Sequence, residues 1–226
     1  MRNIFFTLIF LTTLTGCFNS DPLFPIRRLS RNEDLSKKEE ASSYYKQAID
    51  VMVDAYSSYA GLNRDVGIKL LKRQEYKPAI KHLEISTSIK NNDGSAYYWL
   101  GVCYVNLYKI EKDAEFLTMA DKNYNIALNI TPNNKEYLYA YAQLLFYGFE
   151  DYDKAIEVLK NLIFNLNADV KENYFLLARG YYMIGDYKAA YQTYNEIYKF
   201  KNKMTKQEKE KLEEFIQITR SNLTNE

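Results

Sequence analysis

Residues 97–132 read YYWLGVCYVNLYKIEKDAEFLTMADKNYNIALNITP, and the spacing of side chains in this stretch sets the architecture of the chain. Its first half places an aromatic residue, a leucine, a small residue and a second aromatic residue at helical spacing: Tyr97, Leu100, Gly101 and Tyr104. Its second half carries Ala120, Tyr124, Ala127 and Pro132. Since positions three and four apart lie on one face of a helix, the stretch predicts two amphipathic helices, ended by a proline.

The same order of residue types returns elsewhere in the chain. One copy contains Tyr174, Leu177, Ala178, Tyr181, Gly185, Asp186, Tyr187, Ala190 and Tyr194. Another contains Leu138, Tyr141, Ala142, Leu145, Tyr152, Ala155 and Leu159. The weakest copy contains Val66, Gly67, Leu70, Tyr76, Ala79 and Leu83. A unit that recurs at a nearly fixed period predicts an array of repeats in which neighbouring units bury one another's apolar faces.

The small residue of each predicted second helix measures the period. Ala79, Ala120, Ala155 and Ala190 are separated by 41, 35 and 35 residues. The excess in the first interval falls near residues 109–116, where it either lengthens a helix or forms a protruding loop. Small residues at these positions let the two helices of a unit approach closely, while Tyr and Phe fill the space between units.

Segments on both sides of the repeats also have helical periodicity. Residues 36–60 form a predicted N-terminal helix, opened by a Ser36–Glu39 capping box. Residues 205–226 form a predicted capping helix and tail, opened by Thr205 and Glu208. Its apolar stripe is Leu212, Phe215, Ile216 and Ile218, and its polar side would close the exposed end of the array.

The repeated pattern resembles the tetratricopeptide signature, with its aromatic-x-x-Leu-Gly-x-x-Tyr, Ala-x-x-x-aromatic and Pro positions in units of about 34 residues. The resemblance implies an all-α fold: a tetratricopeptide-type helical-hairpin solenoid, a right-handed superhelix, with about four repeats over residues 61–204. It also implies a binding scaffold whose first helices line a groove for a protein or peptide.

Groove positions of the family fall on named residues of this sequence. The predicted partner-binding residues are Arg64, Lys72, Tyr98, Asn106, Tyr139, Gln143, Tyr147, Phe175, Arg179 and Tyr182, with Ile68, Val102, Phe146 and Met183 beside them. Tyr and Arg are enriched at binding hot spots. Ile68 and Trp99 stand where the family's carboxylate-clamping variant has asparagine, so that clamp is not expected.

The N-terminus has the pattern of a targeting segment. Residues 4–14 are an apolar run of eleven residues after Arg2, too short for a bilayer of about 30 Å but of signal-peptide length. The following Leu14-Thr15-Gly16-Cys17 resembles a bacterial lipobox. That resemblance implies a signal peptide over residues 1–16, lipidation of Cys17 and a flexible tether over residues 17–35, and hence a bacterial cell envelope location.

Residue chemistry argues against several functions. Lys plus Arg number 30 and Asp plus Glu number 29, so no net basic field attracts nucleic acid. His82 is the sole histidine and is expected to be solvated, while Cys103 is expected in the core. The sequence therefore predicts no catalytic residues, no metal site and no cofactor, and a protein that is not an enzyme.

Two hypotheses of function follow. The first is a lipid-anchored adaptor in the envelope that binds another envelope protein or peptide in its groove. The second is a periplasmic small-molecule-binding or transporter-associated lipoprotein, in which the aromatic side chains enclose a pocket. A closed pocket of roughly a few hundred cubic ångströms would favour the second hypothesis, and an open groove would favour the first.

Overall fold

A computed structural model describes residues 27, 30–31 and 34–223 of the chain. These residues form nine α-helices, two π-helical turns and one 3₁₀ segment, with no strand among them. In chain order the elements are α3 (Leu35–Lys72), α4 (Tyr76–Ile89), α5 (Gly94–Glu111), α6 (Glu115–Ile130), α7 (Lys135–Leu144), η1 (Leu145–Phe149), α8 (Tyr152–Lys160), η2 (Asn161–Asn165), α9 (Lys171–Met183), α10 (Tyr187–Glu196), η3 (Ile197–Lys203) and α11 (Lys206–Leu223). The predicted signal peptide and Cys17 lie outside the described residues.

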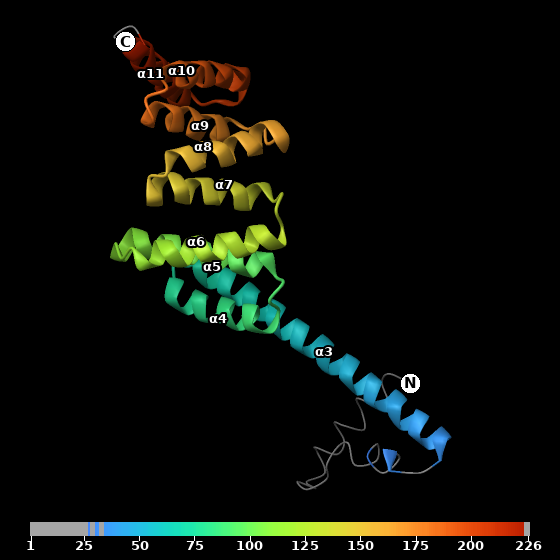
Figure 1. Ribbon diagram of the computed structural model, residues 1–226. Coiled ribbons are helices and arrows are strands. Elements are labelled where there is room, and N and C mark those ends of the chain that lie inside the picture. The colour runs from blue at the N-terminus through green and yellow to red at the C-terminus, as the bar shows by residue number, and fades with distance from the viewer. Residues whose placement is uncertain (1–26, 28–29, 32–33, 224–226) are drawn as a thin grey trace. The chain divides into compact units, whose positions relative to one another are not determined.

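The chain divides into two compact units, residues 1–59 and residues 60–226. Within the second unit, α4 to α11 follow one another in chain order along the stack (Figure 1). The last turns of α3 pair with α4, where Gly67 meets Leu83 and Asn63 meets His82. The later hairpins are α5 with α6, α7 with α8, and α9 with α10. The predicted all-α, tetratricopeptide-like fold is thereby confirmed.

The N-terminal helix differs from the prediction. Residues 36–60 were expected to form a helix of their own, but α3 runs from Leu35 to Lys72 without a break. Gly61 alone does not end a helix, since an isolated glycine merely weakens it. The first turn of α3 is capped by Asp34 and not by the predicted Ser36–Glu39 capping box. The Asp34 carboxylate accepts hydrogen bonds from the Ser36 amide and from the Ser36 hydroxyl, both at 3.0 Å.

The turn inside each hairpin has one recurring design. A residue in the left-handed region comes first: Gln74, Lys112, Glu150 or Gly185. An acidic residue follows at once: Glu75, Asp113, Asp151 or Asp186. The Asp151 and Asp186 carboxylates each accept a hydrogen bond from a backbone amide of the next helix, at 3.2 and 2.9 Å. These caps satisfy amides that the helix itself leaves without a partner.

The excess residues of the second repeat lengthen its helices. α5 has 18 residues, whereas its counterpart α9 has 13 and α7 with η1 covers residues 135–149. α6 has 16 residues, whereas α8 with η2 covers residues 152–165. Only residues 112–114 separate α5 from α6. Of the two outcomes that the sequence left open, the lengthened helix is correct, and no protruding loop forms there.

Small residues make the close helix crossings, as predicted. Ala79, Ala120, Ala155 and Ala190 have no exposed surface. A Cβ atom added to Gly101 would lie 2.5 Å from the ring of Tyr124, and one added to Gly67 would lie 2.6 Å from Leu83 Cγ. Both neighbours are buried, so neither can move aside without disturbing the core.

The core of the second unit consists of two apolar clusters. One joins α4, α5 and α6 with Tyr137 and Leu144 of α7, and the other runs from Leu138 through α8, α9 and α10 to Leu212 of α11. Leu128 and Tyr141 pack against both clusters. The apolar core is therefore continuous along the stack, as expected where each repeat covers the next.

The C-terminal helix closes the stack. Thr205 and Glu208 form the predicted capping box: the Thr205 amide donates to Glu208 Oε2 at 2.8 Å, and the Glu208 amide donates to Thr205 Oγ1 at 3.2 Å. Leu212 is buried, but Ile218 is exposed and Thr219 takes the buried place instead. The prediction for Ile218 is therefore wrong, because residues 212, 215, 216 and 219 recur at helical spacing on the packed face, and position 218 lies outside it.

We expect opposite effects from alanine at two glycines. Gly61→Ala should raise the free energy of unfolding by about 0.5–1 kcal/mol, since a Cβ there meets nothing within 4 Å and alanine favours helix. Gly101→Ala should lower it by roughly 1–3 kcal/mol through overpacking against Tyr124. Urea denaturation monitored by circular dichroism measures both changes. Equal effects of the two substitutions would contradict the close crossing of α5 and α6.

The ion pair between Lys171 Nζ and Glu208 Oε1, at 2.6 Å, should make the docking of α11 sensitive to acid. This pairing, with the hydrogen bonds from Thr205, lowers the pKa of Glu208 from 4.5 to about 2. A lowered pKa adds stability above the unfolded-state pKa, and this stability is lost as pH falls from about 4.5 towards 2. Glu208→Gln should therefore lower the Tm at neutral pH, and its difference from the native chain should shrink as pH falls from about 5 to about 3. A difference that is constant over this range would contradict the assignment.

Candidate functional site

An open hollow lies where α7, η1 and α9 meet the start of α11. Four of the predicted groove residues line it together: Tyr139, Tyr147, Phe175 and Arg179. Lys171, Glu172, Leu176 and Glu208 complete the lining. Its volume is about 180 Å³. The four predicted residues come from the first helices of the third and fourth repeats, which the family resemblance implied would face the groove.

Arg179 is the central polar group of the hollow. Its Nη1 donates a hydrogen bond to the Tyr147 hydroxyl at 2.8 Å, and its guanidinium lies 5.4 Å from the centre of the Tyr147 ring. It also lies 5.3 Å from the centre of the buried Phe146 ring. Cation–π contacts of this kind hold a guanidinium in place without neutralising it. Within the described part of the chain, no carboxylate forms an ion pair with Arg179.

Tyr139 forms the half-buried wall of the hollow. Burial raises the pKa of its hydroxyl above the ordinary tyrosine value, and Tyr147 and Glu172 raise it further, while a hydrogen bond with Gln143 acts in the opposite direction. The phenol is therefore protonated at neutral pH and retains a proton to donate. Gln143 itself is exposed beside it on α7.

On the opposite rim of the hollow, the positive charge of Lys171 is balanced by neighbouring carboxylates. Lys171 Nζ lies 2.6 Å from Glu208 Oε1 and 4.0 Å from Glu172 Oε1. Since two carboxylates already surround this ammonium group, Arg179 is the lining cation that remains available to a ligand's negative charge. The sequence reasoning did not include Lys171, Glu172, Leu176 and Glu208 in the groove. Only the Thr205–Glu208 capping signal pointed to the start of α11.

Tyr98 is not a groove residue, contrary to the prediction. It is buried, its ring stacks on Tyr137 with the centres 4.6 Å apart, and its hydroxyl donates to Glu136 Oε1 at 3.1 Å. Burial and the adjacent Glu136 raise its pKa. Phe146 is buried as well. Both side chains belong to the core because α7 and α9 cover them.

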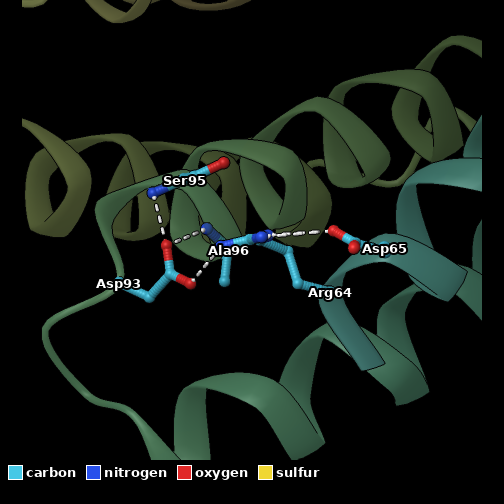
Figure 2. A network of polar contacts seen from close by, with 5 residues as sticks. All are labelled: Arg64, Asp65, Asp93, Ser95 and Ala96. Carbon is cyan, nitrogen blue, oxygen red and sulfur yellow. Dashed lines mark hydrogen bonds and ion pairs between the residues drawn. The ribbon is translucent and has the colours of Figure 1, made fainter. Parts of the chain in front are cut away.

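Arg64 serves the repeat junction rather than the hollow. Figure 2 shows its guanidinium at the Asp93 carboxylate, where Nη1 lies 2.8 Å from Oδ2. Asp93 also caps α5, because its Oδ1 accepts hydrogen bonds from the amides of Ser95 at 3.1 Å and Ala96 at 3.3 Å. Asp65 pairs with the other side of Arg64 at 3.2 Å. The arginine therefore links the end of α3 to the start of α5.

The other predicted groove residues also lie away from the hollow. Asn106 donates from Nδ2 to the Val102 carbonyl of its own helix at 2.8 Å. Lys72 is the exposed last residue of α3. Tyr182 packs edge-on against Tyr187, and its hydroxyl accepts a hydrogen bond from Asn222 of α11 at 3.1 Å. Four of the predicted groove residues thus line one hollow and several others make contacts within the fold, while Lys72 and Gln143 are exposed outside the hollow.

His82 and Cys103 have structural surroundings. His82 Nδ1 lies 2.9 Å from Oδ1 of the buried Asn63, so the expectation of a freely solvated histidine is wrong. Cys103 is fully buried, as predicted, and burial raises its thiol pKa to about 12, which disfavours the reactive thiolate. Among the described residues, no group of three or more His, Cys, Asp or Glu is placed to hold a metal ion. In the same residues, no helix combines the length and apolar character needed to cross a bilayer.

Comparison with known proteins supports the fold. A TPR repeat-containing protein of Borreliella burgdorferi is 29% identical over 142 residues, or 59% of this chain and 60% of that relative's length. The match therefore leaves a large part of the relative uncovered. No family model matches the chain.

Solved structures show the same architecture. The MamA protein superposes with a TM-score of 0.63 at 16% identity, covering 74% of this chain and 83% of MamA. MamA 41-end from Desulfovibrio magneticus RS-1 gives 0.59 at 18%, covering 74% and 92%. YrrB, described as a TPR protein with an unusual peptide-binding site, gives 0.51 at 18%, covering 60% and 65%. The chain thus has an all-helical, tetratricopeptide-like fold.

Proposed function

We propose that this chain is a lipid-anchored scaffold of a bacterial cell envelope, and that the hollow between α7, η1 and α9 binds a segment of another envelope protein. The observation that carries the proposal is the placement of Arg179 with Tyr147, Tyr139 and Phe175 in one open hollow. Aromatic residues and arginine contribute most of the binding energy at protein interfaces.

The lining indicates the chemistry of the bound segment. Tyr147 is 54% exposed and offers an apolar ring beside the Arg179 guanidinium. Phe175 and Leu176 add apolar surface, and the Tyr139 hydroxyl adds a donor. A peptide that places a carboxylate next to an apolar side chain would satisfy the cation and cover the rings together. Charge-assisted hydrogen bonds to a guanidinium are stronger than neutral ones and fix the orientation of the carboxylate.

The hollow is less suited to a small molecule. Its volume of about 180 Å³ is below the roughly 300–1,000 Å³ of typical ligand pockets, and it is open to solvent. An apolar solute there would keep much of its surface in water. The geometry therefore favours the adaptor over the solute-binding lipoprotein. The peptide-binding site described for YrrB belongs to that protein, but it is consistent with a peptide-binding role for this fold.

The membrane anchor is the second part of the proposal. Its support is the sequence Leu14-Thr15-Gly16-Cys17 after the apolar run of residues 4–14. Each buried methylene contributes about 0.8 kcal/mol, so two acyl chains on Cys17 would give stable attachment. Residues 17–35 would then act as the tether that lets the repeats reach a partner.

Cys17→Ala tests the anchor. We expect the native chain, expressed in a bacterium with lipoprotein processing, to incorporate labelled palmitate and to enter the detergent-rich phase on Triton X-114 partition. The variant should lose the label and shift to the aqueous phase. Cys103→Ala is the matched control, since this buried thiol has no part in anchoring and its variant should keep the label. Retention of the label by the Cys17 variant would exclude the proposed modification.

Tyr147→Ala combined with Arg179→Ala tests the hollow. Crosslinking of the tagged full chain in intact envelopes, followed by affinity capture, should recover a discrete protein with the native chain. The double variant should recover at most about one tenth as much of this protein, because two side chains of the hot-spot type are removed. Tyr198→Ala with Arg73→Ala is the control, since both side chains are exposed and lie outside the hollow. Equal recovery with the two double variants, or no protein recovered with the native chain, would overturn the proposal.

A further inference from the structure

A second surface, unrelated to the hollow, lies on the part of α3 that belongs to the first unit. Apolar residues recur there with alternating spacings of four and three: Tyr45, Ile49, Met52, Tyr56 and Tyr59. Over two heptads this spacing places the five side chains along one narrow line of the helix, the line that pairs with another helix in a coiled coil. The pattern is compatible with a short coiled-coil seam.

Four of the five seam residues are exposed in the structure, and Tyr45 is half-buried. Ile49, Met52 and Tyr56 are each 58% exposed, and the adjacent Val53 is 60% exposed. Isolated apolar residues on a surface are ordinary, but a contiguous row of large ones marks an interaction site. The row of five extends over two heptads of α3.

We propose that residues 45–59 of α3 form a coiled-coil interface with the same segment of a second copy of this chain. The flanking positions support a self-interaction: they are Ala48, Val53 and Ala55, with Lys46 as their single charge. Two identical seams therefore meet without like charges facing each other along most of their length. An unlike helix, by contrast, is usually selected by charged flanking residues, and this seam has almost none.

The polar side of the helix disfavours a membrane as the occupant. Helices that lie on membranes carry Lys and Arg on the polar face. Here the side opposite the seam carries Asp50, Asp54 and Gln47. Acidic residues would be repelled by anionic head groups, while they remain well solvated on the outside of a two-stranded coil.

The expected interface is modest in size. At 1.5 Å per residue the segment is about 22 Å long, and its seam would bury on the order of 400–500 Å² per chain. This area is at the lower end of specific interfaces, so we expect a reversible dimer. It would bring two binding hollows together, and a partner with two matching segments would then be held by effective concentration. The dimer itself does not depend on the function proposed for the hollow.

Cysteine crosslinking in the full-length chain tests the dimer. Met52 lies at the middle of the seam, so cysteines at position 52 would approach each other in either helix orientation. Met52→Cys should give a disulfide-linked dimer under mild oxidation, at a level at least about fivefold above Asp54→Cys on the opposite side. Cys103 is buried and does not compete, and Cys17 is the same in both variants. Co-expression of two differently tagged copies identifies the partner as a second copy.

A second comparison separates a specific seam from chance collision. Ile49→Asp with Tyr56→Asp, added to Met52→Cys, should reduce the dimer to the level of Asp54→Cys, while circular dichroism shows unchanged helix content. Dimer that persists in this variant, equal crosslinking at positions 52 and 54, or crosslinks to a different protein would each overturn the proposal. Protection of the thiol introduced at position 52 from maleimide only when vesicles are present, without dimer, would also overturn it in favour of a membrane surface. Loss of partner capture by the hollow variants would leave these outcomes unchanged.

Discussion

The close approach of the two helices within each hairpin makes the stacking in the second unit possible. Where α5 crosses α6, the ring of Tyr124 occupies the space that a side chain at Gly101 would need. At the other crossings, alanines with no exposed surface have the same role. Because the two helices of each hairpin lie close together, the large aromatic and aliphatic side chains can extend outward between hairpins and join successive repeats into one core. Wider crossings would leave those side chains facing cavities.

An array built in this way has ends that must be covered. At the C-terminal end, α11 buries Leu212 against the fourth repeat and is tied to α9 by the Lys171–Glu208 ion pair. The same contact forms one rim of the candidate binding hollow. Stability and function thus share residues there, since the rim that stabilises the last repeat also neutralises Lys171. Arg179 is thereby left as the cation that a bound carboxylate would meet.

The two proposed interaction surfaces rest on different physical principles. The hollow is a concave site on the first helices of two repeats, where a held arginine and exposed rings would give orientation and specificity. The seam on α3 is a straight, almost uncharged row, where packing alone would drive association. The first suits recognition of a foreign segment and the second suits a copy of itself. A membrane-anchored scaffold could use both, because a dimer doubles the number of hollows offered to one partner.

The helices and their pairing could be predicted from the amino-acid sequence, because each depends on residues close together in the chain. Small residues recur at helical spacing, and Thr205 and Glu208 bond reciprocally as their spacing predicted. The sequence also identified four of the residues that line the hollow. It erred over α3, where nothing local marks an end at residue 60, and over Ile218, which lies off the helical face that Leu212, Ile216 and Thr219 share.

Which aromatic residues are available to a partner was settled by tertiary packing alone. Tyr98 and Tyr147 were both predicted to line the groove, yet Tyr98 is buried against Tyr137 of the next repeat, while Tyr147 is open beside Arg179. The contact between Tyr147 and Arg179 joins residues 32 positions apart, and that between Lys171 and Glu208 joins residues 37 apart. Local periodicity gives the face of a helix on which a side chain lies, but the neighbouring repeat determines whether that face is covered.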